Sequence, residues 1–287
     1  MIKDRKIFSS ISLVCGLCYL TFLLASCGGK HQDVLLDEED TTDTLTKITR
    51  SSLACISINM PSPIKVTEEI SGAGIGYDRT LVNPSSKLSS YSTNYQKALN
   101  LGIYGTDLGY VTGFKQMQDA LGYVGAVKRM SEELGVSGAY DEKILKRIIE
   151  NLSKADSAEA VAELIDEVYS KAERNLRSKE RVEVAGLVIA GGWLEGLHIA
   201  TTALGTMARN DKSENLYNRI WEQAYAYRYI LDLFNDNIKN PDFLKLTEAF
   251  KDIQILCKTL EGKPKLNNTD ILLLKGKITE ARNKITG

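Results

Sequence analysis

Two short stretches of the sequence place an acid and a second polar side chain three residues apart. Glu195 and His198 form one pair, and Asp107 and Tyr110 form the other. Side chains three residues apart share a face of a helix, and ferritin-like proteins bind metal ions with Glu and His at this spacing. The pairs predict a small polar site whose candidate ligand-binding residues are these four, with Asp107, Glu195 and His198 as candidate ligands of a single metal ion.

The histidine content argues against a larger metal centre. A dinuclear carboxylate site uses two Glu-x-x-His motifs, and His31 is the only other histidine in the chain. The alternative is that the acids and the imidazole hydrogen-bond to each other in the core, with shifted pKa values and no metal. The sequence predicts no cofactor and no set of catalytic residues, and the glycine-rich stretch 72–76 is expected to be irregular connecting chain because no strand precedes it.

Both pairs lie in segments with small residues at helical spacing. These are Ala98, Gly102, Gly105, Gly109 and Gly113 in the first segment and Ala185, Gly192, Gly196, Ala200 and Ala203 in the second. An interior glycine costs a helix about 1 kcal/mol relative to alanine, and close contact between helix backbones offsets that cost. We therefore predict that helices over 91–112 and 180–208 cross at their glycines.

The rest of the chain beyond residue 85 also has the caps and apolar spacing of helices. The further predicted helices are 114–134, 142–152, 157–178, 214–238, 241–260 and 270–285. Segment 184–208 is long and apolar enough to span a membrane, but a buried acid at its centre would be costly in lipid. We predict an all-α fold, a multi-helix bundle with a central pair of glycine-rich helices.

Helix 214–238 carries a row of four aromatic residues beside its apolar stripe. The row consists of Tyr217, Trp221, Tyr225 and Tyr229. Aromatic faces stack on flat ligands, which makes Trp221 a candidate ligand-binding residue. The alternative is a wide buried face between two neighbouring helices, because apolar stripes at this spacing are usually core.

The beginning of the chain has the features of a targeting segment. Lys3, Arg5 and Lys6 precede eighteen uncharged residues, 7–24, which is typical of an export signal. The following Leu24-Ala25-Ser26-Cys27 resembles the lipobox of bacterial lipoproteins. That resemblance implies cleavage before Cys27 and acylation of Cys27 as its lipidation site. In lipoproteins of this kind, Gly28 in place of an Asp after the acylated Cys favours localisation at the outer membrane. An uncleaved membrane span is the alternative.

We accordingly divide the chain into three parts. These are a signal peptide over 1–26, the lipidated Cys27 with a flexible acidic tether over 27–62, and a single all-helical domain over 63–287. With 36 basic and 37 acidic residues, the chain lacks the positive charge that nucleic-acid binding requires. Cys55 and Cys257 remain after cleavage, and whether they form a disulfide is left open.

Segments 98–110 and 190–197 resemble those of uncharacterised helical lipoproteins of bacteroidete-type bacteria. The resemblance implies a location and a fold but brings no known activity. We expect a non-enzymatic envelope protein, attached to membrane lipid through acylated Cys27, whose helical body binds a partner protein or a small ligand. The alternatives are a metal-binding protein or enzyme using Asp107, Glu195 and His198, and a spacer that only links the membrane to another envelope layer.

Overall fold

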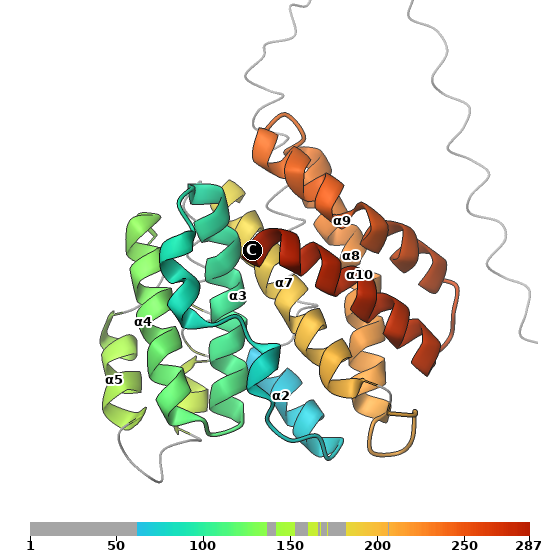
Figure 1. Cartoon of the computed structure of the whole chain (residues 1–287), viewed down its shortest axis with the longest axis horizontal. Coiled ribbons are helices and arrows are strands. Elements are labelled where there is room, and N and C mark those ends of the chain that lie inside the picture. The colour runs from blue at the N-terminus through green and yellow to red at the C-terminus, as the bar shows by residue number, and fades with distance from the viewer. Residues whose placement is uncertain are drawn as a thin grey trace, which may run out of the picture. The chain divides into compact units, whose positions relative to one another are not determined.

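The computed structural model describes the main helical part of the chain. The described residues are 62–136, 142–152, 160–165, 167, 171, 182–205 and 207–287. Within them the bounds are α2 Pro63–Gly72, η1 Arg79–Leu81, η2 Ser85–Ser90, α3 Asn94–Gly113, α4 Met117–Glu133, α5 Glu142–Leu152, α7 Val182–Leu204, α8 Glu214–Asp236, α9 Pro241–Leu260 and α10 Asn268–Thr286. This described part contains no strand (Figure 1), which confirms the predicted all-α bundle. The predicted signal peptide, Cys27, Cys55 and most of the tether lie outside it.

Local capping explains where several helices begin. Thr93 and Gln96 form a reciprocal capping box at the start of α3, and Asn267 and Asp270 form another at the start of α10. Each box satisfies backbone N–H groups that have no partner inside the helix. Helix α9 begins with Pro241, whose missing N–H costs nothing at a first-turn position.

The central pair of helices consists of α3 and α7, whose backbones touch where they cross. A Cβ added at Gly102 would lie 2.7 Å from the backbone nitrogen of Gly192, and one added at Gly191 would lie 2.9 Å from the carbonyl carbon of Leu99. The hydroxyl of Thr106 also donates across the contact to the carbonyl oxygen of Gly192, at 3.3 Å. The predicted crossing of glycine-rich helices is confirmed.

The glycines of α3 contact two different helices, α7 and α2, and the sequence did not predict the second contact. Gly109 faces Pro63 of α2 and Gly113 faces Thr67 of α2, so the prediction that Gly109 lies in the α3–α7 crossing is wrong. Crossing helices diverge within a few turns, which leaves the remainder of a row free for a third helix. The third helix is α2, which ends at Gly72, where the stretch predicted to be irregular begins.

Helix α7 passes through the middle of the bundle and contacts α2, α3, α8 and α10 (Figure 1). Among the described residues it is the one helix long and apolar enough to cross a membrane by length and composition, and 83% of its most apolar window is buried inside the protein. Neighbouring helices therefore cover the apolar surface of α7, as we expected for a core helix.

The last helix returns to the centre of the bundle. Helix α10 packs against α9 and α7, and its C-terminal end lies beside α3 and α7 (Figure 1). Ile271, Leu274, Ile278 and Ile285 form its buried apolar stripe. Arg282 occupies a position of the same stripe, four residues after Ile278, so the fold carries a guanidinium group into the core.

Candidate functional site

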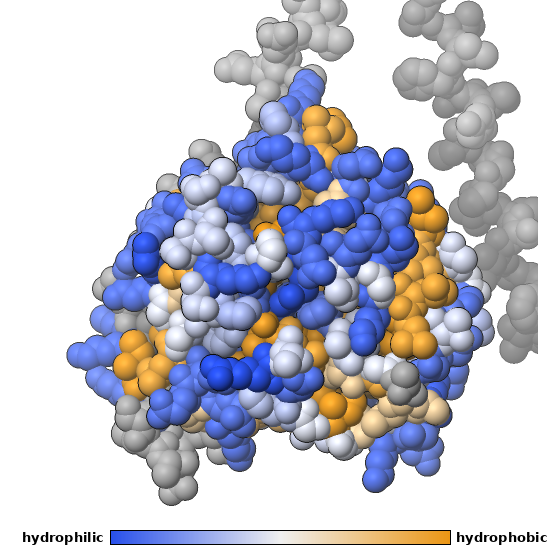
Figure 2. Space-filling model, in the orientation of Figure 1, coloured by the Kyte–Doolittle hydropathy of each residue, from blue (hydrophilic) through white to orange (hydrophobic). Residues whose placement is uncertain are grey.

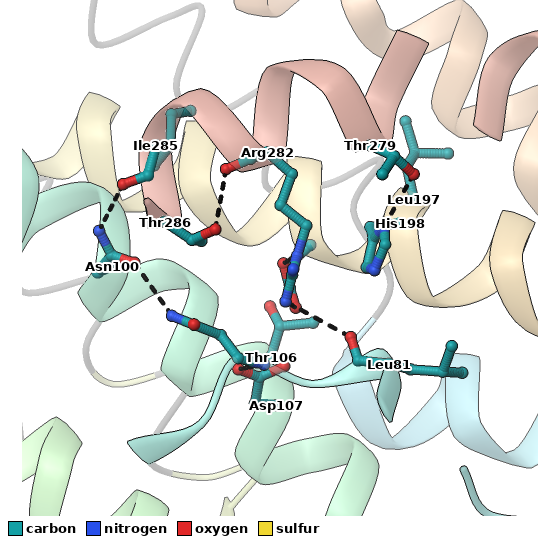
Figure 3. Close-up of polar contacts among 12 residues, drawn as sticks. Leu81, Asn100, Thr106, Asp107, Leu197, His198, Thr279, Arg282, Ile285 and Thr286 are labelled. Atoms are coloured by element: carbon teal, nitrogen blue, oxygen red, sulfur yellow. Dashed lines mark hydrogen bonds and ion pairs between the residues drawn. The ribbon is translucent and has the colours of Figure 1, made fainter. Parts of the chain in front are cut away.

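A cluster of two acids and one arginine lies next to the α3–α7 crossing (Figure 3). Helix α3 contributes Asp107, α7 contributes Glu195 and α10 contributes Arg282, and both carboxyl groups are fully buried. The guanidinium Nε of Arg282 lies 2.6 Å from Oε2 of Glu195, and its Nη2 lies 2.7 Å from Oε1. This is a two-point, charge-assisted pair, the strong form of the arginine–carboxylate interaction.

Asp107 lies against the same pair but in a different environment. Its Oδ2 accepts a hydrogen bond from the backbone N–H of Asn83 at 3.1 Å. Burial raises the pKa of Asp107 well above its ordinary value, and the charge and hydrogen bond of Glu195 raise it further. Arg282 and the Asn83 N–H act in the opposite direction but do not cancel the rise. Burial disfavours the charged form of a carboxyl group, and Glu195, by contrast, forms an ion pair with Arg282.

Hydrogen bonds tie the cluster to the connecting segment between η1 and α3. The Asn83 side-chain amide donates to the Tyr91 hydroxyl at 2.9 Å and to Oδ1 of Asn100 at 3.3 Å. The Tyr123 hydroxyl donates to the Asn83 carbonyl oxygen at 3.0 Å, and Arg282 reaches the Leu81 carbonyl oxygen at 3.5 Å. The cluster thus fastens α3, α4, α7, α10 and this segment to one another.

His198 is buried one turn beyond Glu195, with its Nδ1 at 3.4 Å from the hydroxyl of Thr279 on α10 (Figure 3). Burial lowers the pKa of His198 to about 4, against a smaller opposing effect of Glu195. The imidazole is accordingly neutral near pH 7. It bridges α7 to α10 rather than joining the carboxyl groups around a common centre.

Tyr110 and Trp221 lie apart from the acid cluster. The Tyr110 hydroxyl accepts from the backbone N–H of Asp78 at 3.0 Å, so it positions the chain before η1. Trp221, on α8, stacks on Tyr225 with ring centres 5.6 Å apart and donates its indole N–H to the Lys263 carbonyl oxygen at 3.1 Å. Of the five candidate binding residues, the structure places Asp107 and Glu195 in one cluster, with His198 one turn away on α7.

The arrangement of these three side chains does not match a metal site. Among the described residues, no group of three or more His, Cys, Asp and Glu side chains is placed to hold a metal ion. Arg282 donates hydrogen bonds to both carboxylate oxygens of Glu195. The hydrogen bonds of the three side chains run to Asn83, Arg282 and Thr279, so each of these buried polar groups has a partner on another element.

Sequence reasoning missed Arg282 as well as Asn83 and Asn100. A signal for Arg282 existed, since a charged residue at an apolar-stripe position of a helix requires a buried partner. Asn83 and Asn100 offered no comparable signal, because isolated asparagines occur throughout loops and helix surfaces.

A groove of about 480 Å³ lies outside the cluster, between η1, η2 and the start of α4. Its volume falls within the range of small-molecule pockets. Arg79 and Asp119, the charged residues in its wall, pair with each other at 2.9 Å. Ser85, Ser86 and Gln118 add polar groups, so the groove suits a small, uncharged polar ligand.

Comparison of the chain with protein families, curated proteins and solved structures finds no match.

Proposed function

We propose that this protein is a lipid-anchored, non-enzymatic component of the bacterial cell envelope whose helical body binds a partner protein. The lipobox-like stretch before Cys27 supports the anchor, and acyl chains contribute about 0.8 kcal/mol per buried CH₂ to membrane binding. The closed acid cluster supports a non-enzymatic role, since Asp107 and Glu195 are fully buried and bonded within the protein.

The observation that carries the partner-binding role is the exposed apolar surface of the α9–α10 pair. Ile255 of α9 is 58% exposed and Leu273 of α10 is 53% exposed. Lys277 and Asp252 form an ion pair between these helices at 2.7 Å, and Leu273 and Ile255 each lie about one turn from that pair. Figure 2 shows apolar surface along the side where α9 meets the beginning of α10.

An exposed apolar patch with a polar rim marks a protein interaction site. A photo-crosslinking amino acid at position 255, introduced into the full-length protein in its own host, tests the proposal. We expect a discrete adduct at position 255, and loss of that adduct in a Leu273→Glu background. The matched control is position 121, because Leu121 is 40% exposed on α4, away from this pair. Equal labelling at 255 and 121, or an adduct indifferent to Leu273→Glu, would contradict the proposal.

The anchor is tested separately. We expect an alkyne-tagged fatty acid to label the wild-type protein in cells and to leave Cys27→Ala unlabelled. The variant should also leave the membrane fraction or accumulate with an unprocessed leader. Labelling that persists in Cys27→Ala would contradict lipidation at this residue without bearing on the α9–α10 surface.

A further inference from the structure

Two acids and one base meet in the core where none of the carboxyl oxygens contacts solvent. Asp107 and Glu195 are both fully buried, and Arg282 is the guanidinium that faces them. With both acids ionised, the cluster would carry a net negative charge inside the protein. An uncompensated buried charge is costly enough that one of two neighbouring carboxyl groups takes up a proton.

The hydrogen bonds decide which acid is protonated. Both oxygens of Glu195 accept from Arg282, which stabilises its ionised form. Oδ2 of Asp107 accepts from the Asn83 N–H, whereas its buried Oδ1 has no partner as an acceptor. Glu195 is near enough to Asp107 to raise the pKa of the Asp107 carboxyl. A proton on Oδ1 would donate to Glu195, and it would satisfy the one oxygen of the cluster that otherwise lacks a bond.

We propose that Asp107 and Glu195 share one proton, carried on Oδ1 of Asp107, and that this proton makes the junction of α3, α7 and α10 sensitive to alkaline pH. Loss of the proton places two negative charges against one positive charge at the point where these helices meet. The junction then weakens, and with it the attachment of the segment that carries Asn83.

Other titratable groups surround the cluster. Burial raises the pKa of Tyr104 and of Tyr123, so both phenols stay neutral. His198, on the same face of α7 as Glu195, has a pKa of about 4 and is neutral as well. Tyr91 faces Arg282, and Lys275 of α10 acts on His198. Among these groups, Asp107 is the carboxyl whose pKa is raised by its burial in the cluster.

The sign of the effect follows from the direction of the Asp107 pKa shift. An aspartate in the unfolded chain has a pKa near 4, and the folded protein holds the pKa of Asp107 well above that value. Folding therefore takes up a proton. The raised pKa of Asp107 contributes its full stabilisation of the folded protein below about pH 4. That stabilisation is lost as the pH rises through the folded-state pKa, and the folding equilibrium constant falls by up to tenfold per pH unit.

Asp107→Asn provides the test, because its amide has the shape and hydrogen bonds of the protonated acid. The amide oxygen can accept from Asn83 and the NH₂ group can donate to Glu195. We would measure urea unfolding of the full-length protein in detergent from pH 6 to pH 9. The ratio of wild-type to Asp107→Asn folding constants should fall as the pH rises, by up to tenfold per unit. The control is Asp119→Asn, at a partly exposed acid of α4 that pairs with Arg79, and the ratio of wild-type to Asp119→Asn folding constants should not show this fall. A constant ratio for Asp107→Asn would overturn the proposal.

Infrared spectroscopy of the wild-type protein gives a second readout that needs no variant. With ¹³C in aspartate side chains, we expect a protonated-carboxyl band at neutral pH that shifts on labelling and disappears at alkaline pH. No such band, or a band that shifts only when glutamate is labelled, would overturn the assignment of the proton to Asp107.

Discussion

Glycine-to-alanine substitutions along α3 should have opposite effects on stability at positions one turn apart. In Gly102→Ala the new methyl group would press on the α7 backbone, 2.7 Å from the nitrogen of Gly192 and 2.9 Å from the carbonyl carbon of Val188. In Gly105→Ala the new methyl group meets nothing within 4 Å. The two variants have the same chemistry in the same helix, so their difference isolates the helix crossing.

The expected magnitude combines two effects. Alanine gains about 1 kcal/mol of helix propensity over glycine at either site. Overpacking costs about 1–3 kcal/mol, and the upper end applies at Gly102 because the obstructing atoms belong to the backbone of α7 and cannot rotate away. Gly102→Ala should therefore lose about 2 kcal/mol of unfolding free energy. Gly105→Ala should gain up to about 1 kcal/mol.

Urea denaturation followed by far-ultraviolet circular dichroism measures both variants, and thermal unfolding provides a check. A loss of about 2 kcal/mol corresponds to a fall in Tm of about 4–8 °C for a domain of this size. The same contrast on α7 pairs Gly191→Ala, which faces the Leu99 carbonyl group, with Gly196→Ala, which faces open space. A Gly102→Ala variant as stable as Gly105→Ala would refute the backbone contact between α3 and α7.

Three further predictions concern individual polar groups. Arg282→Met should cost about 3–5 kcal/mol in urea unfolding because it leaves the Glu195 charge buried without a partner, and adding Glu195→Gln should recover part of that loss; no recovery would contradict the pairing. Glu69→Gln weakens the two-point pair between Glu69, 14% exposed, and Arg219, 19% exposed, and should lower the free energy of unfolding by about 1 kcal/mol. Hydrogen exchange should then speed up in α2 and stay unchanged in α10. The His198 ring should show no NMR titration between pH 5 and pH 8, because burial lowers its pKa to about 4. The free energy of unfolding should fall as the pH drops from about 6.5 towards 4, since the pKa of His198 is lower in the folded protein than in the unfolded chain. An NMR titration midpoint near pH 6.5 would contradict the burial of the ring.

The helices themselves were predictable because their signals are local. Helix α9 has the predicted bounds 241–260, and α8 begins at Glu214 as predicted. Proline and asparagine caps act within one turn of the residues that they stabilise. Helix α2 was missed because it has ten residues, fewer than an isolated helix needs for stability in water. Its formation depends on packing Pro63 and Thr67 onto glycines of α3 that lie more than 40 positions away.

The candidate site was predictable only in part. The spacing of Glu195 and His198 placed both on one side of a core helix, and the small residues of α3 brought Asp107 into the same region. The sequence could not show that Arg282, 87 positions beyond Glu195, would neutralise that acid. The metal hypothesis was drawn from residue spacing and did not include Arg282, which forms an ion pair with Glu195.

The sequence alone determined that the body of this protein is helical, that α7 belongs in its core and that two glycine-rich helices meet. Each of these conclusions depends on side-chain periodicity and caps, which operate over a few residues. The tertiary structure decided which glycine faces which helix, and which base balances the buried acids. Both outcomes depend on the crossing of α3 and α7 and on the docking of α10 across them. Contacts between helices depend on atoms from distant parts of the chain, and the spacing of residues within one helix does not determine them.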